Sequence, residues 1–436
     1  MVFEVFMLYG FRGILMSSYI LSLNCGSSSV KFNLFKISPG NTLQPHIQGI
    51  AEEIGNGNSS RLKYSIEEQE YKLKCYIANH RDALMLIFEE FKKYGIDTAG
   101  ILAVGHRVVH GGDKYRKSVL VNENVLETIR GLIPIAPLHN PPNITGIEEA
   151  AKLLPGVPQV AVFDTAFHST LPEYAYRYAI PNEWYNDFGV RKYGFHGISH
   201  MFVSKRAARF LGVPYNKFNC ITAHLGNGCS ITKICSGKSM DTSMGFTPLE
   251  GVVMGTRSGD IDPALIEYVV KKLVENSNIT EGEAYRNVMQ SLNKESGLKA
   301  LASTNMMQDI RQRALEGDNT AKTAILIYSY RIAKYIASYW ATMPCCHAIV
   351  FTAGVGENEG FVRKQILSFL ENLKIVLDED KNKLRHQEVV IGESNLIENN
   401  TSIMVIPTNE EIVIGYDALY IGYLGTFAPD IYPFEF

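Results

Sequence analysis

Residues 19–35 read YILSLNCGSSSVKFNLF, and this stretch indicates how the chain begins to fold. Its apolar start predicts a strand over 19–24, and a second strand is predicted over 30–37, directly after a turn of Asn, Cys, Gly and Ser. Such a turn offers backbone N–H groups and hydroxyls with few obstructing side chains, which suits phosphate oxygens. A plain hairpin turn is the alternative for this stretch taken alone.

A similar unit recurs about two hundred residues later. Residues 219–234 read NCITAHLGNGCSITKI, again an apolar strand, a Gly-rich turn and a strand. The duplication suggests two related halves with a cleft between them, in which the two turns could hold a polyphosphate from both sides. A third Gly-rich segment, 349–358, reads IVFTAGVGEN; it follows a predicted strand and opens a helix, so its backbone could approach a ligand closely or form an ordinary turn.

Composition fits a globular enzyme of two or three domains, at about 100–200 residues each. The chain has 436 residues, 46% of them hydrophobic, and a net charge of −3, which gives no electrostatic case for nucleic acid or an anionic membrane. Its seven cysteines include no C-x-x-C pair, which favours the reduced thiols of a cytoplasmic protein.

Residues 1–16 form an apolar N-terminal extension. The segment is too short and interrupted to span a bilayer, and it lacks the basic region and cleavage site of a signal peptide. An ordered extension and an upstream start that is not always used both remain open.

Predicted strands and helices alternate, which indicates an α/β fold. Besides the two strands above, apolar runs predict strands over 46–52, 60–66, 70–76, 157–163, 348–352 and 403–406. Apolar spacing and start signals predict helices over 82–94, 199–211, 320–343 and 357–373, and helices starting at Thr145, Asp262, Thr280 and Asn409.

Four polar residues stand in Gly-rich segments or at the end of a buried strand: Arg107, Asp164, His196 and Arg257. Active-site groups of α/β sheets often lie at strand ends, although a structural pair with Arg is the alternative for Asp164. His106/His110 and His196/His200 have a spacing that could suit a metal, but no Cys cluster or H-E-x-x-H accompanies them, so zinc is disfavoured. Walker A and G-x-G-x-x-G motifs are absent from the sequence, which disfavours those nucleotide-binding folds.

Ten segments together resemble the motifs of the acetate kinase family, a member of the superfamily of sugar kinases, heat-shock ATPases and actin. In family order they are NCGSSSVK (24–31), GHRVVHGG (105–112), PLHNP (137–141), FDTAFH (163–168), YGFHGISH (193–200), HLGNG (224–228), DTSMGFTPLEG (241–251), GTRSGDIDP (255–263), GVGEN (354–358) and TNEE (408–411). Departures are mild: Cys25 replaces the usual Ala, Val355 the usual Ile, and the extension 1–16 and the tail after Gly422 are extra.

The resemblance implies two duplicated ribonuclease-H-like α/β domains, the actin-like ATPase fold, around a central cleft. We expect an acetate-side domain of 17–165 plus 411–436 and a nucleotide-side domain of 166–410. A homodimer is implied by the family alone.

The activity implied is ATP + acetate ⇌ ADP + acetyl phosphate, by direct in-line transfer, with Mg²⁺ (or Mn²⁺). Acetate is ionised at neutral pH and needs no general base; the difficulty is bringing an anion to a polyphosphate, which cations ease. The resemblance assigns catalysis to Arg107, Asp164, His196 and Arg257, with the arginines orienting acetate and the phosphoryl group and His196 donating to its oxygens. It assigns the metal to Asn24, Asp164 and Glu410.

Binding residues are carried over in the same way. Acetate would contact Arg107, Val109, Leu138, His139, Phe195 and Pro248. The nucleotide would contact Ser27, Ser29, Lys31, His224, Leu225, Gly226, Asn227, Gly228, Asp309, Ile310, Arg311, Gly354, Val355, Gly356, Glu357 and Asn358.

Three alternatives stay open. A propionate or butyrate kinase of the same family is one alternative. The substrates differ by single methylene groups, each worth about 1–3 kcal/mol, so the sequence discriminates poorly between them. A pyrophosphate-dependent relative is disfavoured by the intact glycine motif at 354–358. A catalytically silent ATP-binding module is disfavoured because Arg107, Asp164, His196, Arg257 and Glu410 are all intact.

Overall fold

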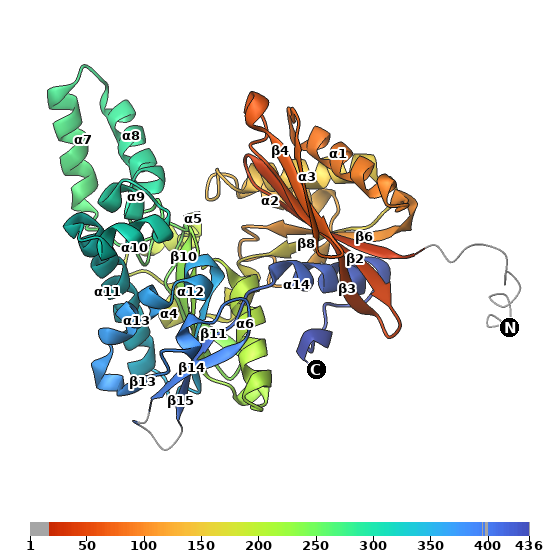
Figure 1. The fold of residues 1–436 in the computed structure, drawn as a ribbon. Helices are drawn as coiled ribbons and strands as arrows, with labels where there is room; N and C mark the ends of the chain where they lie inside the picture. Colours follow the sequence, from red (N-terminus) through yellow and green to blue (C-terminus); the bar gives the residue numbers. More distant parts are fainter. Residues whose placement is uncertain (1–16, 395, 397–399, 436) are drawn as a thin grey trace, which may run out of the picture.

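The computed structural model describes residues 17–394, 396 and 400–435, so the extension 1–16 lies outside the described residues. Two separate β-sheets form the framework, one of eight strands and one of seven. Figure 1 shows the first sheet in red to yellow and the second in green and blue, with helices between and around them.

The first sheet has the strand order β5-β4-β3-β2-β1-β6-β8-β7. Its strands are β1 (Tyr19–Cys25), β2 (Ser29–Ser38), β3 (Thr42–Glu52), β4 (Arg61–Ile66), β5 (Gln69–Lys74), β6 (Ile101–Val108), β7 (Val119–Leu120) and β8 (Gln159–Phe163). Strands β1 to β3 pair antiparallel, whereas β6 runs parallel to both β1 and β8.

The second sheet has the order β11-β10-β9-β12-β15-β14-β13. Its strands are β9 (Cys220–Leu225), β10 (Cys229–Cys235), β11 (Lys238–Thr242), β12 (Ala348–Thr352), β13 (Ile375–Leu377), β14 (Val389–Ser394) and β15 (Thr401–Val405). The run β11-β10-β9-β12-β15 repeats the order and directions of β3-β2-β1-β6-β8. The predicted duplication of an α/β unit is therefore confirmed.

Alternating residues of β1 face two different layers, as expected for a strand. Leu21 and Leu23 pack with α1 (His80–Lys93) and α3 (Asn140–Leu153), while Ile20 packs with α14 (Glu410–Asp417). In the second sheet Ile221 packs with α11 (Asn319–Ala341) and α13 (Gly360–Ser368), while Cys220 packs with α6 (Gly197–Phe210). Helices α6 and α14 therefore share one apolar core with both sheets and form the joint between the two halves.

The remaining helices lie at the edges of these layers or extend beyond them. They are α2 (Glu123–Gly131), α4 (Glu173–Tyr176), α5 (Asn182–Phe188), α7 (Ala264–Asn276), α8 (Glu281–Lys294), α9 (Gly297–Ala302), α10 (Met307–Leu315) and α12 (Ala353–Asn358). Short helical turns are η1 (Gly57–Ser59), η2 (Thr98–Gly100), η3 (Ala166–Thr170), η4 (Tyr215–Lys217), η5 (Glu371–Leu373), η6 (Lys381–Lys383), the π-helical η7 (Ala418–Tyr423) and η8 (Pro433–Glu435).

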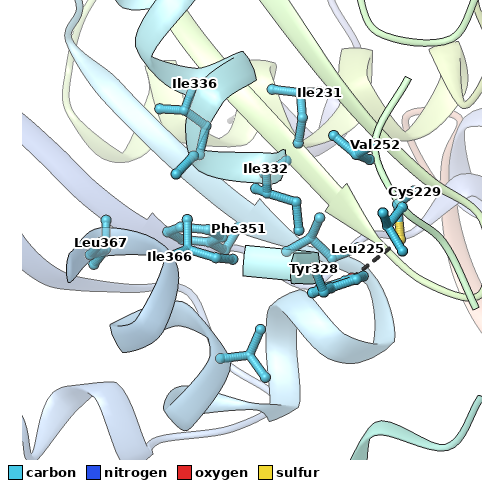
Figure 2. Packing of buried hydrophobic residues seen from close by; sticks show 14 of the residues in the cluster. Leu225, Cys229, Ile231, Val252, Tyr328, Ile332, Ile336, Phe351, Ile366 and Leu367 are labelled. Atoms are coloured by element: carbon cyan, nitrogen blue, oxygen red, sulfur yellow. Dashed lines mark hydrogen bonds between the residues drawn. The ribbon is translucent and has the colours of Figure 1, made fainter. Parts of the chain in front are cut away.

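The core of the second half is a continuous apolar layer between its sheet and helices α11 and α13. Figure 2 shows Tyr328, Ile332 and Ile336 of α11 packed on strand residues such as Leu225 and Phe351. These side chains are fully buried or nearly so. Since burying one such side chain is worth about 1.5–3 kcal/mol, this layer fixes the strand ends that carry the second Gly-rich turn.

Two helix predictions were wrong. Thr145 does not begin a helix: α3 starts at Asn140 with Pro in its first turn, where the fixed φ of proline favours a start, and the Thr145 hydroxyl donates to the Pro141 carbonyl inside the helix. The helix predicted over 357–373 is broken at Glu359, because the guanidinium of Arg363 binds the carbonyls of Gly356 and Glu357 and so ends α12.

Most other predicted elements are confirmed within a few residues. The Thr280 start has a complete capping box with Glu283, and Asn409 caps α14 by accepting from the Ile412 N–H. The prediction at Asp262 is shifted by two residues: α7 starts at Ala264, whose N–H the Asp262 carboxylate accepts.

Candidate active site

Arg107 and Asp164 meet where two parallel strands end together. Strand β6 carries Arg107, Asp164 directly follows β8, and Val108 is paired with Phe163 across the two strands. One guanidinium nitrogen of Arg107, Nη2, lies 2.7 Å from Asp164 Oδ2, and its Nε lies 3.4 Å from Glu410 Oε2 at the start of α14. Burial lowers the pKa of Arg107, but the two carboxylates raise it more, so this arginine stays charged.

Asp164 also fixes the segment that carries His196. Its Oδ2 accepts the His196 N–H at 2.9 Å, and its carbonyl accepts the Gly197 N–H at 2.9 Å. His196 has a φ of 56°, and a Cβ on Gly197 would lie 2.2 Å from the Asp164 carbonyl oxygen, so only glycine fits there. The other carboxylate oxygen, Oδ1, is buried without a hydrogen-bond partner among the described residues.

His196 and Arg257 meet over the second Gly-rich turn. A Cβ on Gly228 would lie 3.2 Å from His196 Nε2 and 3.5 Å from Arg257 Nη1. Arg257 donates to the Pro248 carbonyl at 3.2 Å, and within the described residues it forms no ion pair with a carboxylate. Burial and the nearby Arg107 lower its pKa. The turn, His196 and the two cations therefore face one small region.

The second Gly-rich turn, around Gly226, is held in position by a backbone hydrogen bond from the segment that carries Arg257. The Gly226 N–H donates to the Gly228 carbonyl at 3.1 Å, and the Gly255 N–H donates to the Asn227 carbonyl at 2.9 Å. A Cβ on Gly255 would come within 2.1 Å of Asn227 Oδ1. His224, at the end of β9, stacks on His196 with ring centroids 4.1 Å apart, whereas the predicted contact Leu225 is fully buried in the core.

Two asparagines of α3 hold the segment that follows β6, and one of them, Asn143, also ties it to the first turn. Asn143 donates to the Cys25 carbonyl at 2.8 Å and accepts the Val109 N–H at 3.0 Å, while Asn140 accepts the His110 N–H at 3.2 Å. Sequence reasoning missed both as positioning residues. Two buried asparagines beside a Pro-rich helix start were the available signal, since such amides need fixed partners.

The nucleotide contacts predicted in and after the first turn differ in how exposed their side chains are. Ser27 is exposed and Ser29 partly so, and the turn is closed by the Gly26 N–H donating to the Ser29 carbonyl at 2.8 Å. Lys31 lies beside Glu411 as an ion pair rather than pointing to the turn.

The third glycine segment forms the short helix α12. Ala353 begins it with a φ of 62°, and Glu357 Oε1 accepts the N–H groups of Ala353 at 2.8 Å and Thr408 at 3.0 Å. Glu357 therefore joins β12 to the segment leading into α14. The nucleotide contacts predicted at Gly354, Val355, Gly356, Glu357 and Asn358 stay predictions.

Helix α10 carries the remaining predicted nucleotide contacts. Arg311 lies 3.0 Å from the buried Glu359, which links α10 to the break between α12 and α13. Asp309 is in the first turn of α10, and Ile310 is fully buried, so its side chain belongs to the core.

The residues predicted for acetate are brought together only in part. Val109 and Phe195 are buried in the same apolar cluster, although they come from different halves of the chain. Burial lowers the pKa of His139 to about 4, and the charges of Arg257 and Arg107 add to this effect. Leu138, in contrast, is 47% exposed and belongs to none of the apolar clusters of the described residues.

The residues predicted to bind the metal carry oxygen atoms, which are suitable ligands for a hard cation. Asn24 lies partly exposed at the end of β1, Asp164 has a buried oxygen without a partner, and Glu410 adds a second carboxylate. Burial raises the pKa of Glu410 to about 7, against the effect of Arg107, so a cation bound beside it would favour its ionised form. Oxygen ligands of this kind suit Mg²⁺.

The His pairs considered for zinc have other partners. His106 bonds Gln159 at 2.7 Å, and His110 accepts the Gly112 N–H at 3.0 Å. No cluster of three His, Cys, Asp or Glu suited to a metal is found among the residues that the structure describes.

Within the described part of the chain, no helix combines the length and apolarity required to cross a bilayer.

Comparisons with known proteins agree with this geometry. The model of the acetokinase family matches residues 19–416. An acetate kinase from Carboxydothermus hydrogenoformans is 45% identical over 404 residues, covering 92% of this chain and 98% of that protein, and one from Thermotoga maritima is 46% identical, covering 91% and 97%.

Solved structures are similar over the same span. A propionate kinase from Francisella tularensis superposes with a TM-score of 0.82 at 44% identity, covering 91% of this chain and 98% of that one. The acetate kinase of Porphyromonas gingivalis gives 0.81 at 40% identity, covering 93% and 100%. The chain therefore belongs to the acetokinase family.

Proposed function

We propose that the chain transfers the terminal phosphoryl group of ATP to acetate, giving ADP and acetyl phosphate in a reversible reaction. One observation supports this most directly. Arg257 is partly buried and pairs with no carboxylate among the described residues, yet it faces Arg107, His196 and a Gly-rich turn. A partly buried guanidinium without an acidic partner favours binding of an anion, and a carboxylate and a phosphoryl group are both anions.

The chemistry follows from charge. An acetate oxygen attacks the terminal phosphorus while the bond to the leaving oxygen of ADP breaks, and no proton has to leave the nucleophile. Arg107 and Arg257 offset the repulsion between two anions, and His196 Nε2 donates to the transferred group as its charge spreads. A general base role for Asp164 is disfavoured, because ionised acetate has no proton to lose and the carboxylate is paired with Arg107.

We further propose that Asn24, Asp164 and Glu410 hold Mg²⁺, or Mn²⁺, directly or through water. The unpartnered Oδ1 of Asp164 and the raised pKa of Glu410 support this. When bound, such an ion neutralises phosphate charge. The protein residues contribute the ligand oxygens and keep them oriented.

Acetate is favoured over its longer homologues by the close packing around the methyl position. Val109 and Phe195 are 4% and 2% exposed and pack into one cluster, which leaves little freedom to enlarge a pocket there. Propionate is the second candidate, because a propionate kinase is among the structures that this chain resembles.

An acyl phosphate assay tests this proposal. The purified chain with Mg²⁺–ATP should form acyl phosphate with kcat/KM falling from acetate to propionate to butyrate, each added methylene costing about 1–3 kcal/mol. Pyrophosphate in place of ATP is the control. A higher kcat/KM for propionate would assign the second candidate, and no acyl phosphate with any acid would contradict the proposal.

We also propose that 17–165 plus 411–436 and 166–410 act as two domains that close over the cleft, with the crossings at 164–168 and 407–411 as hinges. Both crossings carry candidate metal ligands, so binding of Mg²⁺–ATP and closure are coupled. Assembly as a homodimer remains a proposal taken from the family.

A further inference from the structure

A line of buried hydrogen bonds runs from β9 to His196. Thr222 Oγ1 lies 2.7 Å from His200 Nδ1, His200 Nε2 lies 2.7 Å from Ser230 Oγ, and Ser230 Oγ lies 2.8 Å from His196 Nδ1. Thr222, His200 and Ser230 are fully buried. None of them belongs to the residues assigned above to catalysis, metal or substrate.

Thr222 determines which atom donates in each of these hydrogen bonds. The Thr222 hydroxyl has no other hydrogen-bond partner among the described residues. If it accepted from His200, its own hydrogen would be buried without an acceptor, which is unfavourable. Thr222 therefore donates to His200 Nδ1, and the proton of the neutral His200 ring resides on Nε2.

The remaining bonds follow in order. Ser230 has a single hydrogen and two ring nitrogens as partners. Because its oxygen accepts from His200 Nε2, its hydrogen must point to His196 Nδ1. That nitrogen is then an acceptor, and the proton of His196 is on Nε2, the atom beside Gly228 and Arg257.

We propose that Thr222, His200 and Ser230 are positioning residues that hold His196 in its Nε2–H form, so that its one ring proton always points at the transferred phosphoryl group. The opposite tautomer would present a lone pair to an anion and repel it. The inference rests on the proposed function for its purpose, but the proton order itself is a property of the free protein.

Burial is consistent with this order. It lowers the pKa of His200 well below its usual range, and the nearby His168 and His224 add to the effect, so His200 is uncharged at neutral pH. A charged His200 would donate from both nitrogens and leave Thr222 without an acceptor.

Histidine-selective ¹⁵N labelling tests the proton order without substrate. Long-range ¹H–¹⁵N spectra of the whole, nucleotide-free protein distinguish a bare ring nitrogen from a protonated one. We expect a bare Nδ1 and a protonated Nε2 in both rings; the His196 signals are those lost in His196→Gln, and those of His200 are the ones that shift in Thr222→Val. A proton on Nδ1 of either ring overturns the inference, whatever the enzyme does with acetate.

A matched pair of variants tests the consequence. Thr222→Val keeps the shape but removes the hydroxyl, whereas Thr222→Ser keeps the hydroxyl. Among the described residues, the Thr222 hydroxyl bonds His200 and forms no hydrogen bond with His196 or Arg257. We expect Thr222→Val to lose roughly tenfold in kcat with KM values within about twofold, less than the loss of a whole transition-state donor, and to gain Nδ1–H signal in His196. Thr222→Ser should match the wild type.

Wild-type kcat together with wild-type spectra in Thr222→Val would overturn the inference. If that variant does not fold, Ser230→Ala replaces it in the same comparison, and the wild-type spectrum alone still decides the proton order.

Discussion

Two arginines, one from each half of the molecule, reach the same region in opposite electrostatic settings. Arg107 belongs to the first sheet and lies 2.7 Å from Asp164 and 3.4 Å from Glu410. Arg257, in the second half, donates to the Pro248 carbonyl and has no acidic partner among the described residues. The pKa of Arg107 is raised by its carboxylates, whereas that of Arg257 is lowered by burial.

The difference suggests distinct functions for Arg107 and Arg257, although the sequence motifs give both arginines the same role. Arg107 is part of a charged group with Asp164 and Glu410; both carboxylates are candidate metal ligands, and Asp164 also positions His196. Arg257 pairs with no carboxylate among the described residues, which favours our proposal that its partner is an anionic ligand. Loss of Arg257 should therefore affect turnover with little effect on folding, while changes around Arg107 should affect both.

Arg257→Ala should have the largest effect. We expect kcat to fall by about 10²–10³ or more, the range seen when one transition-state donor is removed, with ATP binding nearly intact. Steady-state kinetics measure the loss, added guanidinium should restore part of it, and Arg313→Ala, which breaks a distant pair with Asp318, is the control. Turnover within about threefold of the wild type would remove Arg257 from the mechanism.

Asp164→Asn should come next. The change removes a candidate metal ligand and the charge that Arg107 pairs with, so we expect a higher Mg²⁺ requirement, a lower kcat and a stability loss of about 3–5 kcal/mol, the usual cost of leaving one partner of a buried pair alone. Mg²⁺ titrations and urea unfolding measure these.

The pH profile of Asp164→Asn separates a metal ligand from a base. Loss of the acid-limb pKa from the kcat profile, with an unchanged Mg²⁺ requirement, would instead favour a base role for Asp164, because a general base acts only when deprotonated.

Buried histidines of both halves predict acid sensitivity. Burial lowers the pKa of His106, in β6, and of His168, in η3, to about 4 from an ordinary value of 6.5. A lowered folded-state pKa means that the unfolded chain binds more protons. The free energy of unfolding is therefore at its full value above about pH 6.5, where both states are unprotonated. It falls as the pH is lowered toward 4, by at most about 1.4 kcal/mol per pH unit for each histidine.

Urea unfolding between pH 7.5 and 4.5 measures this slope. The stability deficit of His106→Gln should shrink as the pH falls, because the variant has no proton to take up at that position. A deficit that is constant with pH would show that His106 is not an acid-sensitive group.

Closure of the two halves should be the smallest effect. Mg²⁺–ADP with a planar phosphoryl mimic and acetate should lower the radius of gyration in small-angle scattering, as expected for hinge closure over a cleft. Protease sensitivity at 164–168 and 407–411 should fall in parallel. An unchanged radius and unchanged cleavage at both crossings would argue against closure.

Much of the fold could be predicted from sequence, because local patterns determine it. The apolar runs around the turn at 24–29 and around Gly226 predicted both copies of the same sheet unit, and the boundaries of α11 and β12 came within two residues. Failures occurred where distant groups decide the outcome: Arg363 ends α12 by binding carbonyls, and no local signal at Glu359 predicts that.

The site shows the same limit. Motifs predicted Arg107, Asp164, His196 and Arg257 as a group, and the structure brings them together. Side-chain partners are set by tertiary packing instead: Asn143 bridges the first turn to β6, Leu138 stays exposed, and Lys31 pairs with Glu411.

Binding of a transition-state mimic tests the central claim, that Arg257 is the cation reserved for the transferred phosphoryl group. Calorimetry compares ADP alone with ADP, acetate and a planar phosphoryl mimic, all with Mg²⁺, in the wild type and in Arg257→Ala. We expect both proteins to bind ADP equally, and only the wild type to gain about 10²-fold or more in affinity when the mimic and acetate are added. An equal gain in Arg257→Ala would contradict the claim.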